Sequence, residues 1–91
     1  MSLPKERVLG PGKLTVKLQD YNQGDVLPMH NHPYDESHIT IIARGSFELR
    51  KPGTEPMKCH PGTYFDFKAH EDHSFVAMED NSRLFNIYKF R

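Results

Sequence analysis

The sequence has few of the residues that staple small domains together. Its 91 residues include one cysteine, Cys59, and no tryptophan. A single cysteine excludes a disulfide within the chain, and a free thiol is more typical of a reducing compartment than of a secreted protein. A chain of this length buries only about 60–65% of its unfolded surface. We therefore expect a bound metal ion or a partner subunit to supplement a thin core.

An excess of charge of either sign is also missing. Twelve basic residues balance twelve acidic ones, and no basic cluster or acidic tail occurs. A nucleic-acid-binding surface needs a concentration of Lys and Arg, so the charge balance argues against nucleic acid as the main partner. No apolar run reaches the length of a membrane span, and residues 1–7 lack the apolar stretch of a signal peptide. We expect a cytoplasmic protein with neither nucleic-acid nor membrane partners.

Short alternating segments and frequent turns make up most of the chain, and no segment keeps a helical period. Leu14, Val16 and Leu18 alternate with polar residues, which predicts a half-buried strand. Seven or eight such strands separated by turns predict an all-β sandwich or barrel. Residues 1–11 are expected to form an N-terminal arm or a short edge segment, and residues 12–91 a single barrel domain. The other expected strands are residues 26–32, 36–43, 57–60, 64–67, 75–78 and 84–90, with one more starting at residue 47.

A cluster of histidines in residues 30–38 is the most specific feature of the sequence. His30 and His32 are two residues apart and share one face of a strand, and Glu36 and His38 do the same. Two adjacent strands facing one interior would bring these side chains together. Neutral imidazole binds zinc, iron, manganese, copper or nickel, and a carboxylate favours the harder of these ions. The cluster predicts a metal centre; a solvated His-rich turn is the alternative.

The strand that follows this cluster is apolar on both faces. Ile39 and Ile41 face away from His38 and yet are apolar, as is Ala43. A strand of this kind lies between two layers or at a subunit interface. Together with the thin core, the pattern predicts a homodimer.

These residues resemble the first motif of the cupins, small double-stranded β-helix, or jelly-roll, barrels. That motif has a glycine, five residues, His-x-His, a short loop, a glutamate, six residues and a second glycine. Gly24, the pair His30 and His32, and Gly45 fit it. His38 stands where the motif has its glutamate.

The second cupin motif has Pro-x-Gly, a strand, a small turn and a lone histidine, to which Pro61-Gly62 and His73 are similar. The resemblance covers roughly residues 12–90. It implies one divalent transition metal ion per chain (Mn, Fe, Ni, Zn or Cu), and the ligands that we assign are His30, His32, His38 and His73. Glu36 is either the motif glutamate or, as we assign it, a catalytic residue.

The resemblance also implies what such a site does. Cupins with mostly histidine ligands resemble non-haem dioxygenases, which implies oxidation of a small organic substrate. Four neutral imidazoles leave the charge of a dication uncompensated, which favours an anionic ligand. The alternatives are a non-catalytic cupin module that binds a small ligand or is stabilised by its metal, and a metal-assisted isomerase or lyase. Fold alone does not decide among them.

The remaining histidines and the aromatic residues are expected to have structural places. His60 and His70 adjoin turns and belong at the surface. Aromatic side chains in short strands usually pack. One of Tyr64 and Tyr88 is expected to point into the barrel mouth, and the other aromatic residues expected in the core or pocket are Phe65, Phe67, Phe75 and Phe85.

Overall fold

The structure, a computed structural model, describes residues 5–9, 14–31 and 37–89. In these ranges the chain forms nine strands and no helix, so no helix that could cross a membrane occurs there. The strands are β1 (Lys5–Leu9), β2 (Leu14–Tyr21), β3 (Val26–His30), β4 (Ser37–Arg44), β5 (Phe47–Arg50), β6 (Met57–Cys59), β7 (Tyr64–Asp66), β8 (His73–Ala77) and β9 (Ser82–Lys89).

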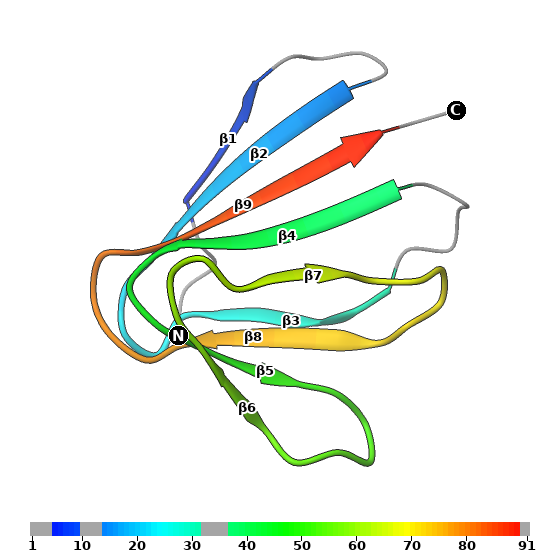
Figure 1. Cartoon of the computed structure of the whole chain (residues 1–91). Helices are drawn as coiled ribbons and strands as arrows, with labels where there is room; N and C mark the ends of the chain where they lie inside the picture. The colour runs from blue at the N-terminus through cyan, green and yellow to red at the C-terminus, as the bar shows by residue number, and fades with distance from the viewer. Residues whose placement is uncertain (1–4, 10–13, 32–36, 90–91) are drawn as a thin grey trace.

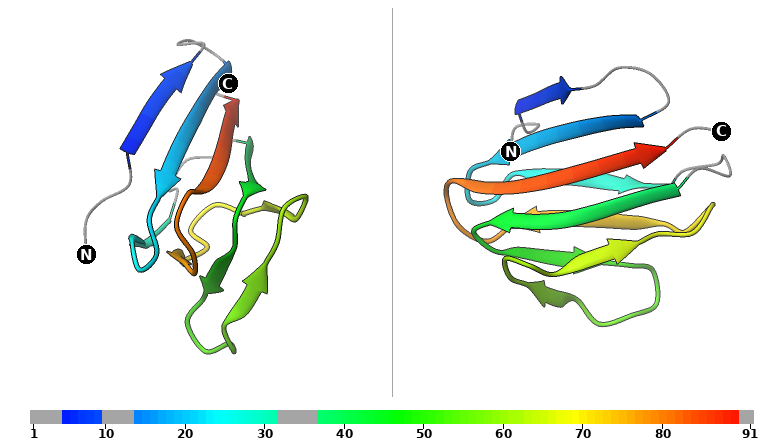
Figure 2. Two further views of the ribbon diagram at one scale, coloured as in Figure 1. Left: turned by 90° about the vertical axis from the view of Figure 1, so that its left-hand side faces the viewer. Right: turned by 45° about the horizontal axis from the view of Figure 1, so that its top comes forward.

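The strands build two antiparallel sheets that face each other (Figures 1 and 2). One has the order β1-β2-β9-β4-β7, and the other has the order β3-β8-β5-β6. Within the described ranges no strand pairing joins the two sheets. The predicted all-β jelly-roll class is confirmed. The segment Lys5–Leu9 is an edge strand that pairs with β2.

The apolar core fills one part of the space between the sheets. Phe47 and Phe75 are fully buried, and Tyr21 packs edge-on against Phe47 with ring centroids 5.0 Å apart. Both sheets contribute, because these residues come from β2, β5 and β8. The other buried members are Ile42, Leu49, Cys59, Phe67, Ala77 and Leu84.

The second glycine of the first cupin-like motif, Gly45, lies where β4 turns into β5. Its φ of +78° is a left-handed conformation that favours glycine. A Cβ atom at this position would overlap the Ser82 side chain and come within 2.8 Å of the Ser82 Cα atom. This close approach lets β4 and β9 stay paired up to the turn.

Strand β2 buries its polar face rather than its apolar one. Thr15 is 8% exposed and Gln19 is 6% exposed, whereas Val16 and Leu18 are only partly buried and lie on the outer side. Inner positions of a sheet normally carry the apolar residues. The inversion indicates that the interior beside this part of β2 is a polar pocket, whereas Tyr21 at the end of the strand lies in the core.

Three sequence expectations differ from the structure. Phe85 lies on the outer face of β9, opposite Leu18 in the β2–β9 register, and is only partly buried, so placing it in the core or pocket was wrong. Tyr64 is 69% exposed on the edge strand β7, so packing it into the interior was wrong. Strand β8 begins at His73, two residues earlier than expected, because His73 pairs with His30 of β3. The polar turn before His73 concealed this start.

Candidate metal centre

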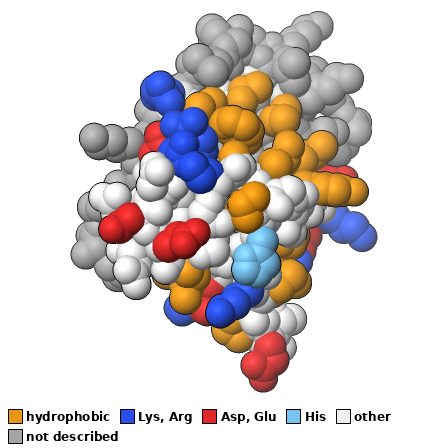
Figure 3. All heavy atoms as spheres, turned by 60° about the vertical axis from the view of Figure 1, so that its left-hand side comes forward, with side chains coloured by type: hydrophobic (Ala, Val, Ile, Leu, Met, Phe, Trp, Pro, Cys, Tyr) orange, Lys and Arg blue, Asp and Glu red, His pale blue; other side chains and the backbone are white. Residues whose placement is uncertain are grey.

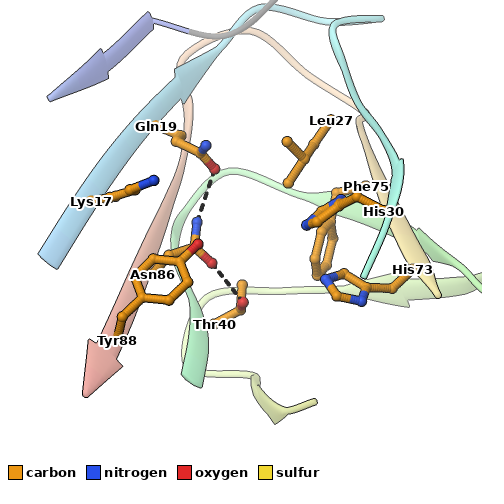
Figure 4. A pocket seen from close by; sticks show the side chains of 9 residues that line it. All are labelled: Lys17, Gln19, Leu27, His30, Thr40, His73, Phe75, Asn86 and Tyr88. Carbon is orange, nitrogen blue, oxygen red and sulfur yellow. Dashed lines mark hydrogen bonds between the residues drawn. The ribbon is translucent and has the colours of Figure 1, made fainter. Parts of the chain in front are cut away.

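Two of the predicted ligands, His30 and His73, lie side by side on neighbouring strands of the four-stranded sheet. They are direct register partners in β3 and β8. Their ring centroids are 4.3 Å apart, and both rings stand at the same wall of a pocket between the sheets (Figure 4). Residues 43 positions apart in sequence therefore meet because the β3–β8 ladder aligns them.

Both imidazoles are held in the same tautomer. The Nδ1 atom of His30 lies 2.7 Å from the carbonyl oxygen of Pro28, and the Nδ1 atom of His73 lies 2.8 Å from that of Glu71. A carbonyl oxygen only accepts hydrogen bonds, so each Nδ1 carries a proton. In a neutral imidazole this leaves the lone pair on Nε2. An Nε2 ligand whose other nitrogen donates to a carbonyl is the usual arrangement around a protein-bound metal.

His73 is the more deeply placed of the two. Its side chain is 1% exposed, and the ring of Phe67 stacks on it with centroids 3.7 Å apart and planes 3° apart. Phe75 meets the imidazole edge-on at 6.3 Å. These aromatic contacts fix the plane of the ring in addition to the hydrogen bond at Nδ1.

The other predicted site residues fall where the structure gives no side-chain description. His32 and Glu36 lie outside the described residues. His38 pairs with Tyr88 in the β4–β9 ladder, but its side chain is not described. Within the described part of the chain no three His, Cys, Asp or Glu side chains form a group that could hold a metal ion. The assigned ligand set therefore stays a prediction, of which His30 and His73 are brought together.

The opposite wall of the pocket is a chain of buried hydrogen bonds (Figure 4). The Thr40 hydroxyl donates to Oδ1 of Asn86 at 2.6 Å, and Nδ2 of Asn86 donates to Oε1 of Gln19 at 2.9 Å. The Tyr21 hydroxyl donates to the same Gln19 oxygen at 3.1 Å. Oε1 of Gln19 thus accepts two hydrogen bonds and links Tyr21 to Asn86.

Lys17 and Tyr88 complete this wall near the open end of the strands. The Lys17 ammonium lies 5.2 Å from the centroid of the Tyr88 ring, a distance at which cation and ring attract. The pocket has a volume of about 230 Å³ and is also lined by Leu27 and Phe75. Tyr88, not Tyr64, is the tyrosine that points into the mouth of the pocket.

Sequence reasoning missed the four polar residues of the pocket wall opposite the histidines. Lys17, Gln19, Thr40 and Asn86 occupy inner strand positions. The signal was present in β2, where the polar residues Thr15, Lys17 and Gln19 alternate with an equally regular apolar row. The alternation alone does not say which of two faces is buried.

Two further histidines and the single cysteine lie away from the pocket. His60 and His70 are exposed, as expected. Cys59 is fully buried in β6, opposite Phe47 of β5, and burial raises the pKa of its thiol. A protonated, enclosed thiol is neither a good nucleophile nor a metal ligand.

Solved structures that resemble this chain share its architecture. KdgF from Halomonas sp. has a TM-score of 0.85 at 24% identity, with 97% of this chain and 81% of that chain covered. An RmlC-like cupin protein from Desulfovibrio desulfuricans has a TM-score of 0.84 at 14% identity, with coverage of 96% and 82%. An RmlC-like cupin from Shewanella frigidimarina has a TM-score of 0.80 at 20% identity, with coverage of 97% and 77%. At these identities the likeness shows a common fold.

Comparison with curated proteins finds no match. The family comparison is decisive, because the cupin domain profile matches residues 17–88. The matched region runs from β2 to β9 and includes both sheets, the paired histidines and the polar wall. The chain belongs to the cupin domain family.

Proposed function

We propose that this protein is a metal-dependent enzyme that acts on a small, oxygen-rich organic anion. The observation that carries the proposal is the pair His30 and His73, which lie side by side and whose Nδ1 hydrogen bonds make Nε2 the nitrogen that could bind a metal. His32 and His38 are the further ligands that the sequence predicts. When bound, a divalent ion would supply Lewis-acid activation of a substrate oxygen and, if redox-active, electrons for dioxygen.

The wall opposite the histidines supports the choice of substrate class. Lys17 brings a positive charge, and Gln19 and Asn86 bring amide N–H groups. Groups of this kind bind carboxylate, carbonyl and hydroxyl oxygens. A substrate between the two walls would have its oxygen atoms recognised on both sides, which fixes its orientation.

The size of the pocket limits the substrate further. Its volume of about 230 Å³ lies below the range of roughly 300–1,000 Å³ that is common for drug-sized ligands. Buried Phe75 and the neighbouring Leu27 close its inner end. The pocket therefore suits an organic acid of a few carbon atoms better than a large aromatic compound.

Metal analysis of tag-free protein tests the central step. We expect about one equivalent of a transition metal in the wild type and in His60→Ala, whose histidine is exposed and outside the pocket. His73→Ala should lose the metal because one of its ligands is gone. Full metal content in His73→Ala, or none in wild type after incubation with Mn²⁺, Fe²⁺, Ni²⁺, Zn²⁺ and Cu²⁺, would overturn the proposal.

Turnover assays on the metal-loaded protein separate the reaction classes. Oxygen uptake with a panel of small keto and hydroxy acids supports the dioxygenase prediction. Conversion without oxygen uptake supports the isomerase or lyase alternative. Glu36→Gln is expected to abolish either activity while the metal is retained, because Glu36 is predicted to move a proton. Ligand binding without conversion of any compound would favour the non-catalytic module.

We also propose that the homodimer forms through the outer face of the five-stranded sheet. Two apolar rows cross β2, β9 and β4 on this face, as the ladder registers align Val16, Ile87 and Ile39 in one row and Leu18, Phe85 and Ile41 in the other. Ile39 is 38% exposed. Figure 3 shows hydrophobic side chains gathered at the surface beside a group of Lys and Arg side chains.

Light scattering of two matched variants tests the dimer. Ile39→Glu puts a charge into the apolar rows and should give a monomer at micromolar concentration. Met57→Glu changes a 51% exposed residue of the other sheet and should leave the dimer intact. A monomeric wild type would contradict this part of the proposal and leave the metal site untouched.

A further inference from the structure

Lys51 lies next to His73, the more deeply buried of the two histidines. It follows β5 in the chain, whereas His73 is the first residue of β8. Arg50 pairs with Ser74 at the end of the β5–β8 ladder, so Lys51, the next residue, comes alongside His73. Its ammonium donates a hydrogen bond to Oε2 of Glu71 at 2.5 Å. The Lys51 and Glu71 side chains are 33% and 30% exposed, so this ion pair is only partly screened by water.

Glu71 closes the turn that precedes His73. Its Oε1 atom accepts a hydrogen bond from the backbone N–H of Lys68 at 3.0 Å, and its own N–H donates to the Lys68 carbonyl at 3.2 Å. Between them His70 has a φ of +63°, a left-handed conformation that a non-glycine residue keeps only when its surroundings impose it. The hydrogen bond from Lys51, followed by that from Lys68, lowers the pKa of Glu71, so the carboxylate is charged.

The same turn provides the carbonyl that holds His73. The backbone oxygen of Glu71 accepts the Nδ1 hydrogen bond of His73 at 2.8 Å. Phe67, just before the turn, stacks on the imidazole, and the Lys51 ammonium lies 5.5 Å from the centroid of the Phe67 ring. Lys51 thus contacts both groups that fix the imidazole, the residue that supplies the carbonyl and the stacked ring.

We propose that Lys51 and Glu71 are positioning residues that hold the His73 imidazole in its metal-binding tautomer and orientation. The inference rests on the proposed function, because His73 matters here as a metal ligand. Lys51 anchors the Glu71 carboxylate, the anchored turn aims the Glu71 carbonyl at Nδ1, and Nε2 is left as the ligand atom. Partners of this kind, one step removed from the metal, raise metal affinity by orienting its ligands.

His30 shows why such an anchor is needed at one histidine and not at the other. Its Nδ1 atom also bonds the carbonyl two residues earlier, but that residue is Pro28, whose ring fixes φ. The corresponding residue for His73 is Glu71, and the sequence has no proline between residues 62 and 91. The ion pair replaces the rigidity that a proline gives at His30.

The first test is made on metal-free protein. Nitrogen-detected NMR of the imidazoles should show His73 as the Nδ1–H tautomer in wild type and in Arg50→Met. Arg50 is the neighbour of Lys51 and pairs with Glu48 on its own strand at 2.7 Å, which makes it a matched control. Lys51→Met should give a mixture of His73 tautomers with an unchanged melting temperature relative to Arg50→Met. Identical His73 signals in the two variants would overturn the inference.

The second test is titration with Zn²⁺. Lys51→Met is expected to weaken Zn²⁺ binding by about 10–100-fold, as loss of a partner to a metal-bound histidine typically does. Lys51→Arg keeps a cation at the same place and should restore most of the affinity. Equal affinities in Lys51→Met and Arg50→Met would contradict the positioning role. If wild type binds none of Mn²⁺, Fe²⁺, Ni²⁺, Zn²⁺ and Cu²⁺, the proposed function fails, whereas a tautomer change in Lys51→Met still supports the role of Lys51.

Discussion

The two halves of the interior differ in chemistry although the same strands line both. On the inner face of the five-stranded sheet, a step of two residues along a strand passes from core to pocket. This step changes Tyr21 to Gln19 in β2, Ile42 to Thr40 in β4, and Leu84 to Asn86 in β9. The facing strand β8 changes in the same way, from Phe75 to His73. In each of these four strands, one end thus contributes to the apolar core and the other end lines the pocket.

The polar half is compatible with burial because its groups bond one another. Thr40, Asn86 and Gln19 are 1%, 3% and 6% exposed and form one hydrogen-bonded chain. Buried polar groups without partners would each cost about 1–3 kcal/mol. The chain begins at Tyr21, whose ring belongs to the core and whose hydroxyl belongs to the pocket wall. Tyr21 therefore joins the two halves.

The largest expected effect comes from emptying the core half. Phe47 is 0% exposed and packs against Tyr21 and Phe75. Phe47→Ala should lower the free energy of unfolding by about 3–5 kcal/mol, because apolar contacts are lost and a cavity remains. Urea denaturation measures this loss. If the two halves are separate in function, the variant still binds metal at temperatures where it is folded; loss of metal from the folded variant would refute that separation.

The next effect comes from the pocket half, through its metal. A metal bound to the folded state alone stabilises it by about 2.7 kcal/mol when its free concentration is 100 times Kd. Removing the metal with a chelator should lower the melting temperature of wild type accordingly. His73→Ala should melt at the same temperature with and without chelator, since it holds no metal. An equal chelator effect on both proteins would place the metal elsewhere.

The sequence was sufficient to predict the fold because the sequence features that indicate it are local. Short alternating segments, turns of glycine and proline, and the spacing around His30 and Gly45 each depend on a few neighbouring residues. The convergence of His30 and His73 was also predicted, through the resemblance to the cupin motifs. Physically it follows from the β3–β8 register, which places the two residues opposite each other.

The pocket wall was not predicted because alternation identifies two faces without saying which faces inward. In β2, Val16 and Leu18 look like the buried row, yet Thr15 and Gln19 are buried. The burial of Gln19 is favourable because its side chain accepts hydrogen bonds from Tyr21 and from Asn86, a residue 67 positions away. The same register aligns the apolar outer rows that we assign to the dimer. Pairing between residues so far apart in the sequence cannot be predicted from the residue pattern of a single segment.

A smaller effect is expected from interrupting the hydrogen-bonded chain. Thr40→Val keeps the shape of the side chain but removes the donor to Oδ1 of Asn86. We expect a loss of about 1–3 kcal/mol in the free energy of unfolding, the cost of a buried acceptor that loses its partner. Thr54→Val is a suitable control, because the exposed Thr54 hydroxyl bonds only within a surface turn. Equal stability of the two variants would mean that the chain contributes little to the fold.

The smallest effect is expected from Asp20, which lies on the outer face of β2, one residue after Gln19. Asp20 accepts two hydrogen bonds from Arg83, at 2.6 and 3.1 Å, and Arg44 and Arg7 lie at 3.8 and 4.0 Å. The hydrogen bond from Arg83 is the main cause that lowers the pKa of Asp20 below its ordinary value of 3.8. At neutral pH, Asp20→Asn should therefore cost about 0.2–1 kcal/mol, as for other exposed ion pairs.

The pH dependence of this difference has a defined sign. Because the pKa of Asp20 is lower in the folded state, its contribution is complete above the unfolded value and is lost as the pH falls through the folded one. The stabilities of wild type and Asp20→Asn should thus converge below about pH 4. Both proteins should bind the same amount of metal at neutral pH, since Asp20 faces away from the pocket. A change in metal affinity in Asp20→Asn would mean that the outer face of β2 is coupled to the pocket, and that the division of the strand into independent faces fails.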